Sequence, residues 1–363
     1  MPRRLFSWLG SRSASTADEP ALPVARPVSP VPGPAPSPAG EPAAPSEAAT
    51  PSLEARELRS HLDAEIAAEL RAMRASLQPV DRNGDAGELL RSLDGDPADA
   101  IRRPPLAAQQ ALAACRDPNA SLDAILATVH QDPALSQSLL RHANSPFYAT
   151  GGGAVSSLRD AASRVGLSGL HGVLIGSMVE GMLCRPGGEF GPMAQQVWQH
   201  MVRTAPIARR VGRALRLPPE TCYTLGLLHD LGKLIVFDRL TAMRTANRQS
   251  VRIRYPVLKD LLGKLHGALG GVAALKWNLD VEGARAIASH PRGAYRTYQD
   301  EWYGELGFTL GESAGETMSQ VLAVAEWWDI TGLRHQARDF DAFWAKGGLT
   351  IDLETCQETL EEA

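Results

Sequence analysis

The sequence is poor in cysteine. Its four cysteines, Cys115, Cys184, Cys222 and Cys356, lie far apart and form no Cys-x-x-Cys pair. A zinc knuckle or a disulfide framework needs closely spaced or systematically paired cysteines, so neither is predicted. This use of cysteine is typical of a reducing compartment, and we expect the protein to be cytoplasmic.

A long apolar run is also lacking. No segment approaches the roughly 18 uninterrupted apolar residues that a membrane span requires. The apolar residues that follow Arg3 and Arg4 are too few for the core of a signal peptide. We therefore expect no transmembrane segment in this sequence.

The chain has no excess of positive charge. It contains 37 basic and 41 acidic residues, which give a formal net charge of -4 at pH 7. A protein without an overall basic field does not attract nucleic acid through its total charge, and binding would need a local patch. We expect no nucleic-acid partner.

The first part of the chain consists largely of proline, alanine, serine and glutamate. Residues 11–51 contain almost no large apolar side chain. Such a segment cannot bury enough surface to offset the entropy lost on ordering, so we predict a disordered tail and linker over residues 1–51. Residues 3–9 combine arginines with leucine, phenylalanine and tryptophan. They are either a short docking peptide for a protein or membrane surface, or a tail whose aromatic residues have no role.

The pattern changes to helix formers at residue 52. Apolar residues recur every three or four positions over 52–77, which predicts an amphipathic helix. This helix either packs on the main domain or pairs with a second chain. Two groups of turn residues then separate the helical linker segment, 52–95, from a compact domain that begins near Asp96.

Within the compact domain, one helical pattern follows another. Ser121 and Asp132 are typical helix N-caps, and a proline follows Asp132 at the first helical position. Two further helices, 158–165 and 170–182, are predicted on either side of a turn at Gly166. No run alternates strictly between apolar and polar residues, so the sequence predicts an all-α fold.

The segment around Gly166 also has the spacing of a helix-turn-helix. A small residue, a turn glycine and a polar start of the next helix are typical of DNA-reading proteins. The following helix offers only His171 and, over residues 169–176, no arginine, lysine, asparagine or glutamine for contacts with base edges. Ordinary helix packing is therefore the better interpretation.

One stretch places several reactive groups side by side. An apolar segment ends in His229 and Asp230, and Lys233 follows within a helical turn. Adjacent helical residues point about 100° apart, so this pair contacts one ion only at the end of an element or with the ion between the two directions. Such an ion needs further ligands from distant segments.

Three other histidines, His200, His266 and His290, fall in separate segments that are predicted to be helical. Packed helices bring such side chains to a common point, as in the metal sites of helix bundles. Nitrogen and oxygen ligands without thiolate suit Fe, Mn, Zn or Mg. A lone helical histidine is more often a packing or surface residue, and that interpretation stays open for each of them.

Parts of the sequence resemble the HDOD family, a branch of the HD-domain superfamily found in bacterial signalling proteins. The resemblance is carried by residues 132–135, 139–148, 161–166, 198–200, 227–233 and 266. It implies a helical HDOD bundle with a five-helix HD-type core over residues 96–335. A C-terminal helical extension, 336–363, would follow.

The resemblance also implies roles for individual residues. By position, the metal ligands of the superfamily's phosphohydrolases correspond to His200, His229, Asp230, His266 and His290. Glu326 stands where the pattern has its final aspartate, which implies a carboxylate ligand with a longer reach. If the protein is an enzyme, Asp230 and Lys233 are the catalytic candidates, with Lys233 on a substrate phosphate.

The sequence departs from the cyclic-dinucleotide phosphodiesterases of the HD-GYP branch. Those proteins carry paired histidines, whereas here His290 is followed by proline, which cannot ligate a metal. No Gly-Tyr-Pro motif follows. A dinuclear centre of that kind therefore lacks one ligand, and a single-metal site is still compatible with the sequence.

Two functions follow from the resemblance. The first is a regulatory module that contacts a signalling protein or a second copy of itself, with a vestigial or mononuclear divalent metal site. The alternative is a metal-dependent phosphohydrolase or phosphodiesterase, in which a bound ion activates water for attack on a phosphorus ester.

Overall fold

The computed structural model describes residues 51–102, 105–117, 119–145, 148, 153–183, 190–247, 251–290, 314–333, 335, 339–347 and 349–361. Over these ranges all regular secondary structure is helical, which confirms the all-α prediction. The predicted disordered tail lies outside the described residues except for Pro51, and the proposed docking peptide at 3–9 lies wholly outside them.

The helix predicted over residues 52–77 is α1, Leu53–Ser76. The side chain of Ser52 caps it by accepting a hydrogen bond from Ala55 N. Its apolar face, which includes the buried Leu62 and Ile66, packs against helix α11, Tyr255–Lys276. The apolar face of α1 is thus covered within the same chain. Three short elements follow: α2, Pro79–Arg82, α3, Asp85–Ser92, and the 3-10 helix η1, Pro97–Ala100.

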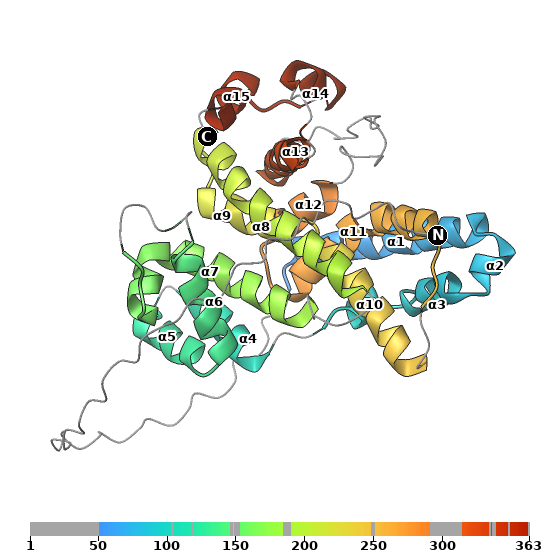
Figure 1. Cartoon of the computed structure of the whole chain (residues 1–363), viewed down its shortest axis with the longest axis horizontal. Coiled ribbons are helices and arrows are strands. Elements are labelled where there is room, and N and C mark those ends of the chain that lie inside the picture. The colour runs from blue at the N-terminus through green and yellow to red at the C-terminus, as the bar shows by residue number, and fades with distance from the viewer. Residues whose placement is uncertain are drawn as a thin grey trace, which may run out of the picture. The chain divides into compact units, whose positions relative to one another are not determined.

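A group of four helices comes next (Figure 1): α4, Leu106–Arg116, α5, Leu122–His130, α6, Pro133–Ala143, and α7, Leu158–Leu183. Ser121 and Asp132 cap α5 and α6 through their side-chain oxygens, as predicted. Gly166 interrupts α7 with φ 76° and ψ 166°, a conformation that glycine adopts without steric cost. The two arms of α7, Leu158–Leu167 and Gly169–Leu183, are consequently bent by 109°.

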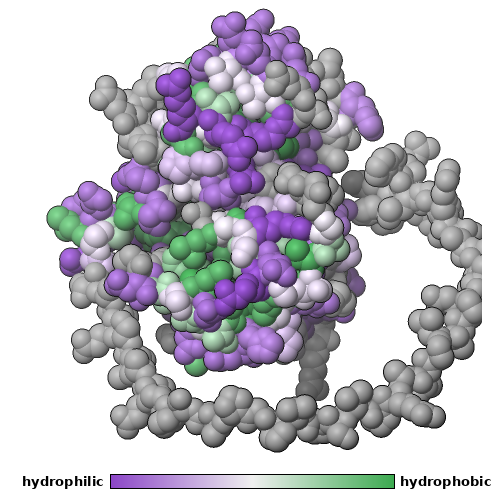
Figure 2. All heavy atoms as spheres, turned by 90° about the vertical axis from the view of Figure 1, so that its left-hand side faces the viewer, coloured by the Kyte–Doolittle hydropathy of each residue, from purple (hydrophilic) through white to green (hydrophobic). Residues whose placement is uncertain are grey.

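Figure 2 shows the face of the molecule to which α5, α6 and α7 contribute. Apolar and hydrophilic surface are mixed on it. Leu167, at the bend of α7, is more than half exposed. In the described part of the chain no single helix is both long and apolar enough to span a membrane, and only the two bent arms of α7 taken together pass that test.

Six helices form the second half: α8, Gly191–Ala214, α9, Pro219–Leu228, α10, Leu231–Asn247, α11, α12, Val281–Ser289, and α13, Ala314–Leu333. Helix α8 contacts α9, α10 and α13, while α11 contacts α10 and α12, and α12 contacts α13. Each helix thus packs against two or more of the others, and their inner faces enclose a common centre. Helices α14, Phe340–Gly347, and α15, Leu353–Glu361, follow, and α15 packs on α8.

One close approach between backbones positions this centre. A Cβ atom on Gly232, at the start of α10, would lie only 1.9 Å from the carbonyl oxygen of His266 in α11. Only glycine permits this contact, because no real Cβ atom comes that close to another heavy atom. The start of α10 is thereby held against α11 beside His266.

Candidate metal centre

His229 and Asp230 form the turn between α9 and α10. Their side chains are buried, at 0% and 1% exposure. The pair therefore sits at the end of an element, which is one of the two arrangements that let neighbouring residues contact the same ion. The preceding stretch, residues 222–228, is apolar and buried. The two polar side chains that follow it therefore lie in the interior.

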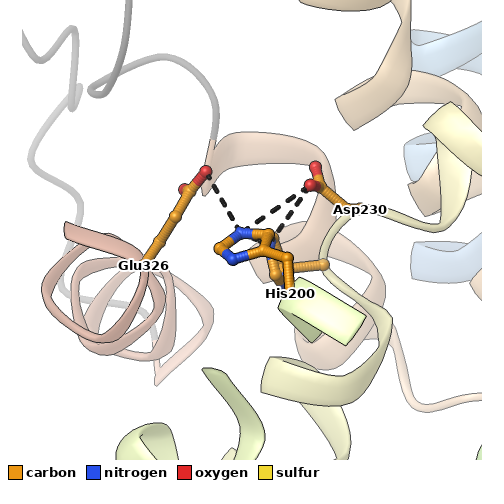
Figure 3. A group of neighbouring side chains, drawn as sticks. His200, Asp230 and Glu326 are labelled. Atoms are coloured by element: carbon orange, nitrogen blue, oxygen red, sulfur yellow. Dashed lines mark hydrogen bonds and ion pairs between the residues drawn. The ribbon is translucent and has the colours of Figure 1, made fainter. Parts of the chain in front are cut away.

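The other proposed ligands come from four further elements. His200 lies on α8, His266 on α11, His290 directly after α12, and Glu326 on α13. Figure 3 shows Glu326 and Asp230 pointing toward the His200 ring. The structure brings all six residues together in two groups whose ligand atoms lie within 4.8 Å of one another: His200, His229, Asp230 and Glu326, and Asp230, His266 and His290.

Asp230 belongs to both groups, and each of its oxygens faces two imidazoles. Oδ2 lies 3.5 Å from His229 Nε2 and 3.9 Å from His200 Nε2. Oδ1 lies 3.6 Å from His266 Nε2 and 3.8 Å from His290 Nε2. Metal–ligand bonds of about 2.1 Å place neighbouring ligand atoms roughly 3 to 3.5 Å apart, so these separations suit an ion better than direct hydrogen bonds.

Backbone carbonyls orient three of the histidines. Nδ1 lies 2.8 Å from Gly226 O in His229, 2.6 Å from Leu262 O in His266, and 2.6 Å from Ile287 O in His290. A carbonyl oxygen only accepts, so Nδ1 carries the hydrogen and the lone pair of the neutral ring is on Nε2. All three Nε2 atoms face Asp230. Histidines that ligate metals are oriented in this way by a partner on their other nitrogen.

A carboxylate orients the fourth histidine. Nδ1 of His200 lies 2.7 Å from Asp329 Oδ2. The Arg203 guanidinium also donates to this carboxylate, from Nε at 2.9 Å and from Nη2 at 3.2 Å. Our sequence interpretation missed both Asp329 and Arg203. The available signal was their spacing, three residues after Glu326 on α13 and three residues after His200 on α8, which places each on the face of its helix that carries a proposed ligand.

The first pair of imidazoles is unusually close. Nε2 of His200 and Nε2 of His229 are 3.2 Å apart. Burial disfavours the charged form of His200, but the hydrogen bond with Asp329 and the nearby carboxylate of Glu326, 3.9 Å from Nε2, outweigh burial and raise the pKa of His200 to about 9. Burial lowers the pKa of His229. Without an ion, His200 is therefore protonated. Its Nε2–H group donates a hydrogen bond to the lone pair on Nε2 of His229.

The pKa values of His266, Glu326 and Asp230 are all lowered, for different reasons. Burial lowers the pKa of His266 to about 3, and the positive charge of Lys233 acts in the same direction. Burial alone would raise the pKa of Glu326, but the interaction with His200, whose Nε2 lies 3.9 Å from Glu326 Oε1, prevails and lowers that pKa to about 2. Likewise, the charge of Lys233 and the interactions with His229 overcome burial and hold the pKa of Asp230 well below its usual value. Without an ion, the centre thus presents two carboxylates, the neutral imidazoles of His229 and His266, and a protonated His200.

Two ligand atoms are buried without a hydrogen-bond partner among the residues that the structure describes: Asp230 Oδ1 and His290 Nε2. Lys233 Nζ lies 2.6 Å from Asp230, but only Oδ2 has the geometry of a hydrogen bond with it. A buried polar group without a partner costs roughly 1–3 kcal/mol. A cation contacted by both atoms would remove this cost, so the residues fit a divalent metal.

The side chains of the centre differ in exposure. Those of Lys233 and His200 are 22% and 14% exposed, whereas those of the other five proposed ligands are at most 7% exposed. Lys233 and His200 are therefore the groups of the centre that are nearest to solvent.

The fold and the centre define a helical protein of the HD type. The model of the HDOD domain family matches residues 101–292, more than half of the chain. The chain belongs to the HDOD family, which confirms the resemblance seen in the sequence.

Solved structures share the fold. A candidate metal-dependent phosphohydrolase from Shewanella amazonensis SB2B superimposes with a TM-score of 0.54 at 17% identity, over 76% of this chain and 99% of that one. A candidate signal transduction protein from Marinobacter aquaeolei VT8 has a TM-score of 0.50 at 19% identity, over 85% of this chain and 65% of that one. At such identities the likeness concerns the fold alone.

A curated relative is also similar in sequence. It is an uncharacterized protein of Treponema pallidum (strain Nichols), 26% identical over 183 residues. The match spans 49% of this chain and only 35% of the length of that protein.

Proposed function

We propose that the protein is a metal-containing regulatory module of the HDOD type. It would hold divalent cations, one in each of the two ligand groups that share Asp230, and act through contacts with a signalling protein. The observation that carries the metal is the convergence of four Nε2 atoms on one buried carboxylate whose Oδ1 has no hydrogen-bond partner among the described residues.

The ligand set limits the choice of ion. Four imidazole nitrogens and two carboxylates, with no thiolate, suit Fe, Mn or Zn. Magnesium prefers oxygen ligands and is the least suited of the ions that the sequence left open. Because both oxygens of Asp230 face a histidine pair, the cluster offers two adjoining positions that share this carboxylate. The second position, with His266 and His290, goes beyond the single site that the sequence supported.

Elemental analysis of the purified full chain tests the metal. We expect bound Fe, Mn or Zn in the wild-type protein and at least a tenfold loss in Asp230→Ala, because Asp230 is the residue common to both ligand groups. His61→Ala is the matched control, since this histidine lies on α1 with a 67% exposed side chain. An Asp230→Ala protein that is folded and retains the wild-type metal content would refute the proposal.

A specific observation favours a second candidate, metal-dependent phosphohydrolase activity. The ammonium group of Lys233 lies beside Asp230 and its side chain is 22% exposed, so it could contact a phosphate oxygen. A divalent ion supplies Lewis acidity and makes water nucleophilic near neutral pH. Glu326 and Asp329 would keep the His200 ring oriented, and Lys233 would bind the ester.

Hydrolysis of bis(p-nitrophenyl) phosphate with added Mn, Fe or Zn separates the two candidates. Metal binding without metal-dependent turnover supports the regulatory module. Turnover that falls at least about a hundredfold in Lys233→Ala, while the metal content stays at the wild-type level, supports the enzyme. The control is Lys264→Ala, because Lys264 is an exposed lysine of α11 paired with Asp260.

A further inference from the structure

Apart from the metal centre, the structure has a cavity between α6, α7 and α8. Its volume is about 330 Å³, at the lower end of the range of small-molecule sites. The lining residues are Arg141, His142, Ser145, Glu180, Gln195, Trp198, Gln199, Val202 and Arg203. None of them is a proposed metal ligand, so this cavity is distinct from the metal centre.

The cavity is lined by one face of α8. Gln195, Gln199 and Val202 recur at helical spacing and are exposed. His200 points about 100° away from Gln199 around the helix axis, toward the metal centre. Helix α8 therefore separates the cavity from the metal centre.

The charged groups of the cavity favour an anion. Arg141 and Arg203 supply two positive charges, against the single carboxylate of Glu180. Arg141 Nη2 pairs with Glu180 Oε2 at 2.5 Å, and the Nε and Nη2 atoms of Arg203 are engaged by Asp329. Nη1 of each arginine makes no hydrogen bond to any described residue and is free to donate to a ligand.

The other lining groups suit an oxyanion attached to an apolar or planar body. Gln195, Gln199 and Ser145 offer neutral hydrogen-bond donors. Trp198, which is buried, and Val202 supply apolar surface. A guanidinium group binds phosphate or carboxylate through its planar set of donors. We infer that this cavity binds a small ligand bearing a phosphate or carboxylate group, held by Arg141 and Arg203.

Arg203 connects this cavity with the metal centre. Its guanidinium donates to the same Asp329 carboxylate that lies 2.7 Å from Nδ1 of His200. A ligand that draws Arg203 toward the cavity loosens its hold on Asp329 and changes how Asp329 orients His200. Anion binding and metal binding are therefore linked, and each changes the affinity of the other by the same factor. This linkage rests on the proposed metal site, whereas anion binding does not.

Calorimetric titration of the full chain with inorganic phosphate and with adenosine monophosphate tests the cavity. We expect Arg141→Gln to weaken binding at least tenfold, since it removes a charged donor without touching the metal centre. Arg159→Gln is the control, because Arg159 is an exposed arginine of α7 paired with Asp123. Tighter binding of the nucleotide than of phosphate supports a ligand with a planar body, whereas equal binding supports phosphate alone.

Three outcomes would overturn the assignment. They are the absence of binding of both probes at millimolar concentrations, equal affinity of the wild type and a folded Arg141→Gln, and binding of an acidic peptide but of neither small probe. Titrations on metal-depleted protein keep this result independent of the metal.

The linkage between anion binding and metal binding is tested by a separate measurement. We expect saturating phosphate to change the metal dissociation constant of the wild type by about fivefold or more, and that of Arg203→Gln by much less. If the protein binds phosphate but no metal, the proposed function fails and the cavity stands. If it binds both and phosphate leaves the metal affinity unchanged, the linkage through Arg203 is wrong.

Discussion

Among the described residues, two polar clusters contain a histidine whose Nδ1 atom faces a backbone carbonyl. In the first, between α6 and α7, His142 Nδ1 lies 2.8 Å from Ser138 O, and Ser177 Oγ lies 2.6 Å from both Ser138 Oγ and Val173 O. In the second, the imidazoles converge on Asp230. In the first cluster these groups have hydrogen-bond partners, and Arg141 also donates to Ser138 Oγ at 3.1 Å.

The second cluster leaves ligand atoms unused. Asp230 Oδ1 and His290 Nε2 have no hydrogen-bond partner among the described residues. Both clusters contain a histidine whose Nδ1 faces a carbonyl, so this orientation by itself does not indicate a metal site. The distinguishing feature is the set of lone pairs that face a shared carboxylate and lack donors. This difference can be tested by substitutions in both clusters.

The largest effect should come from His290. In His290→Gln the position shared with His266 loses a nitrogen ligand, so we expect the metal content to fall from two ions per chain to one. His142→Gln changes the histidine of the other cluster and should leave the metal content unchanged. Metal analysis of both variants makes the comparison, and a wild-type protein with a single ion that persists in His290→Gln would eliminate the second position.

A smaller effect is expected at Asp329. Asp329→Asn removes the charge that orients His200 and keeps the volume of the side chain. Groups that orient a metal ligand contribute about 10- to 100-fold to affinity, so the metal dissociation constant should rise by that factor. Competition with a chromogenic chelator measures it. An unchanged dissociation constant would show that Asp329 only pairs with Arg203.

The pH dependence should follow the proton on His200. Its folded pKa of about 9 lies above the ordinary value of 6.5, so an ion must displace a proton at neutral pH. Metal affinity should rise by up to about tenfold per unit between pH 7 and pH 9 and then level off. Metal titrations across this pH range test the prediction. A metal affinity that does not change with pH would contradict the assignment of a proton between His200 and His229.

The same proton affects the stability of the metal-depleted protein. A group whose pKa is raised on folding stabilises the folded state fully below its unfolded pKa, and this contribution is lost as the pH rises through the folded pKa. Denaturant unfolding of the metal-depleted chain should therefore show declining stability from pH 7 to pH 9.5. The decline should be smaller in Asp329→Asn, because the loss of this carboxylate lowers the pKa of His200.

The smallest effect should come from Ser177→Ala. Removal of this buried hydroxyl should lower the free energy of unfolding by about 1 kcal/mol, the usual net contribution of one hydrogen bond. Metal content should not change, because Ser177 lies between α6 and α7, away from the ligand groups. A loss of metal in this variant would remove the distinction between the two clusters.

Much of the fold could be predicted from short-range patterns. Apolar periodicity predicted α1, and Ser121, Asp132 and Gly166 marked the starts of α5 and α6 and the bend of α7. Caps and bends depend on hydrogen bonds and dihedral angles within a few residues, so the local sequence contains the necessary information.

The residues of the site were harder to predict from local sequence patterns. His229 and Asp230 drew attention because they are adjacent, and the family pattern pointed to the other ligands. Asp329 was missed because its partner His200 is 129 residues away in the chain. Its spacing of three residues from Glu326 was the only local signal, and this spacing does not identify the partner of Asp329. The cavity beside Arg203 could not be predicted from the sequence either, because it lies between three helices.

The sequence by itself determined the helices, their caps and bends, the family, and the types of ligand that are available. The tertiary structure alone decided that four imidazoles from four separate segments meet at the two oxygens of Asp230, and that Asp329 joins His200 to Arg203. The physical reason is distance along the chain: hydrogen bonds within a helix link residues three or four apart, whereas the direction of a buried lone pair depends on how helices more than a hundred residues apart pack together.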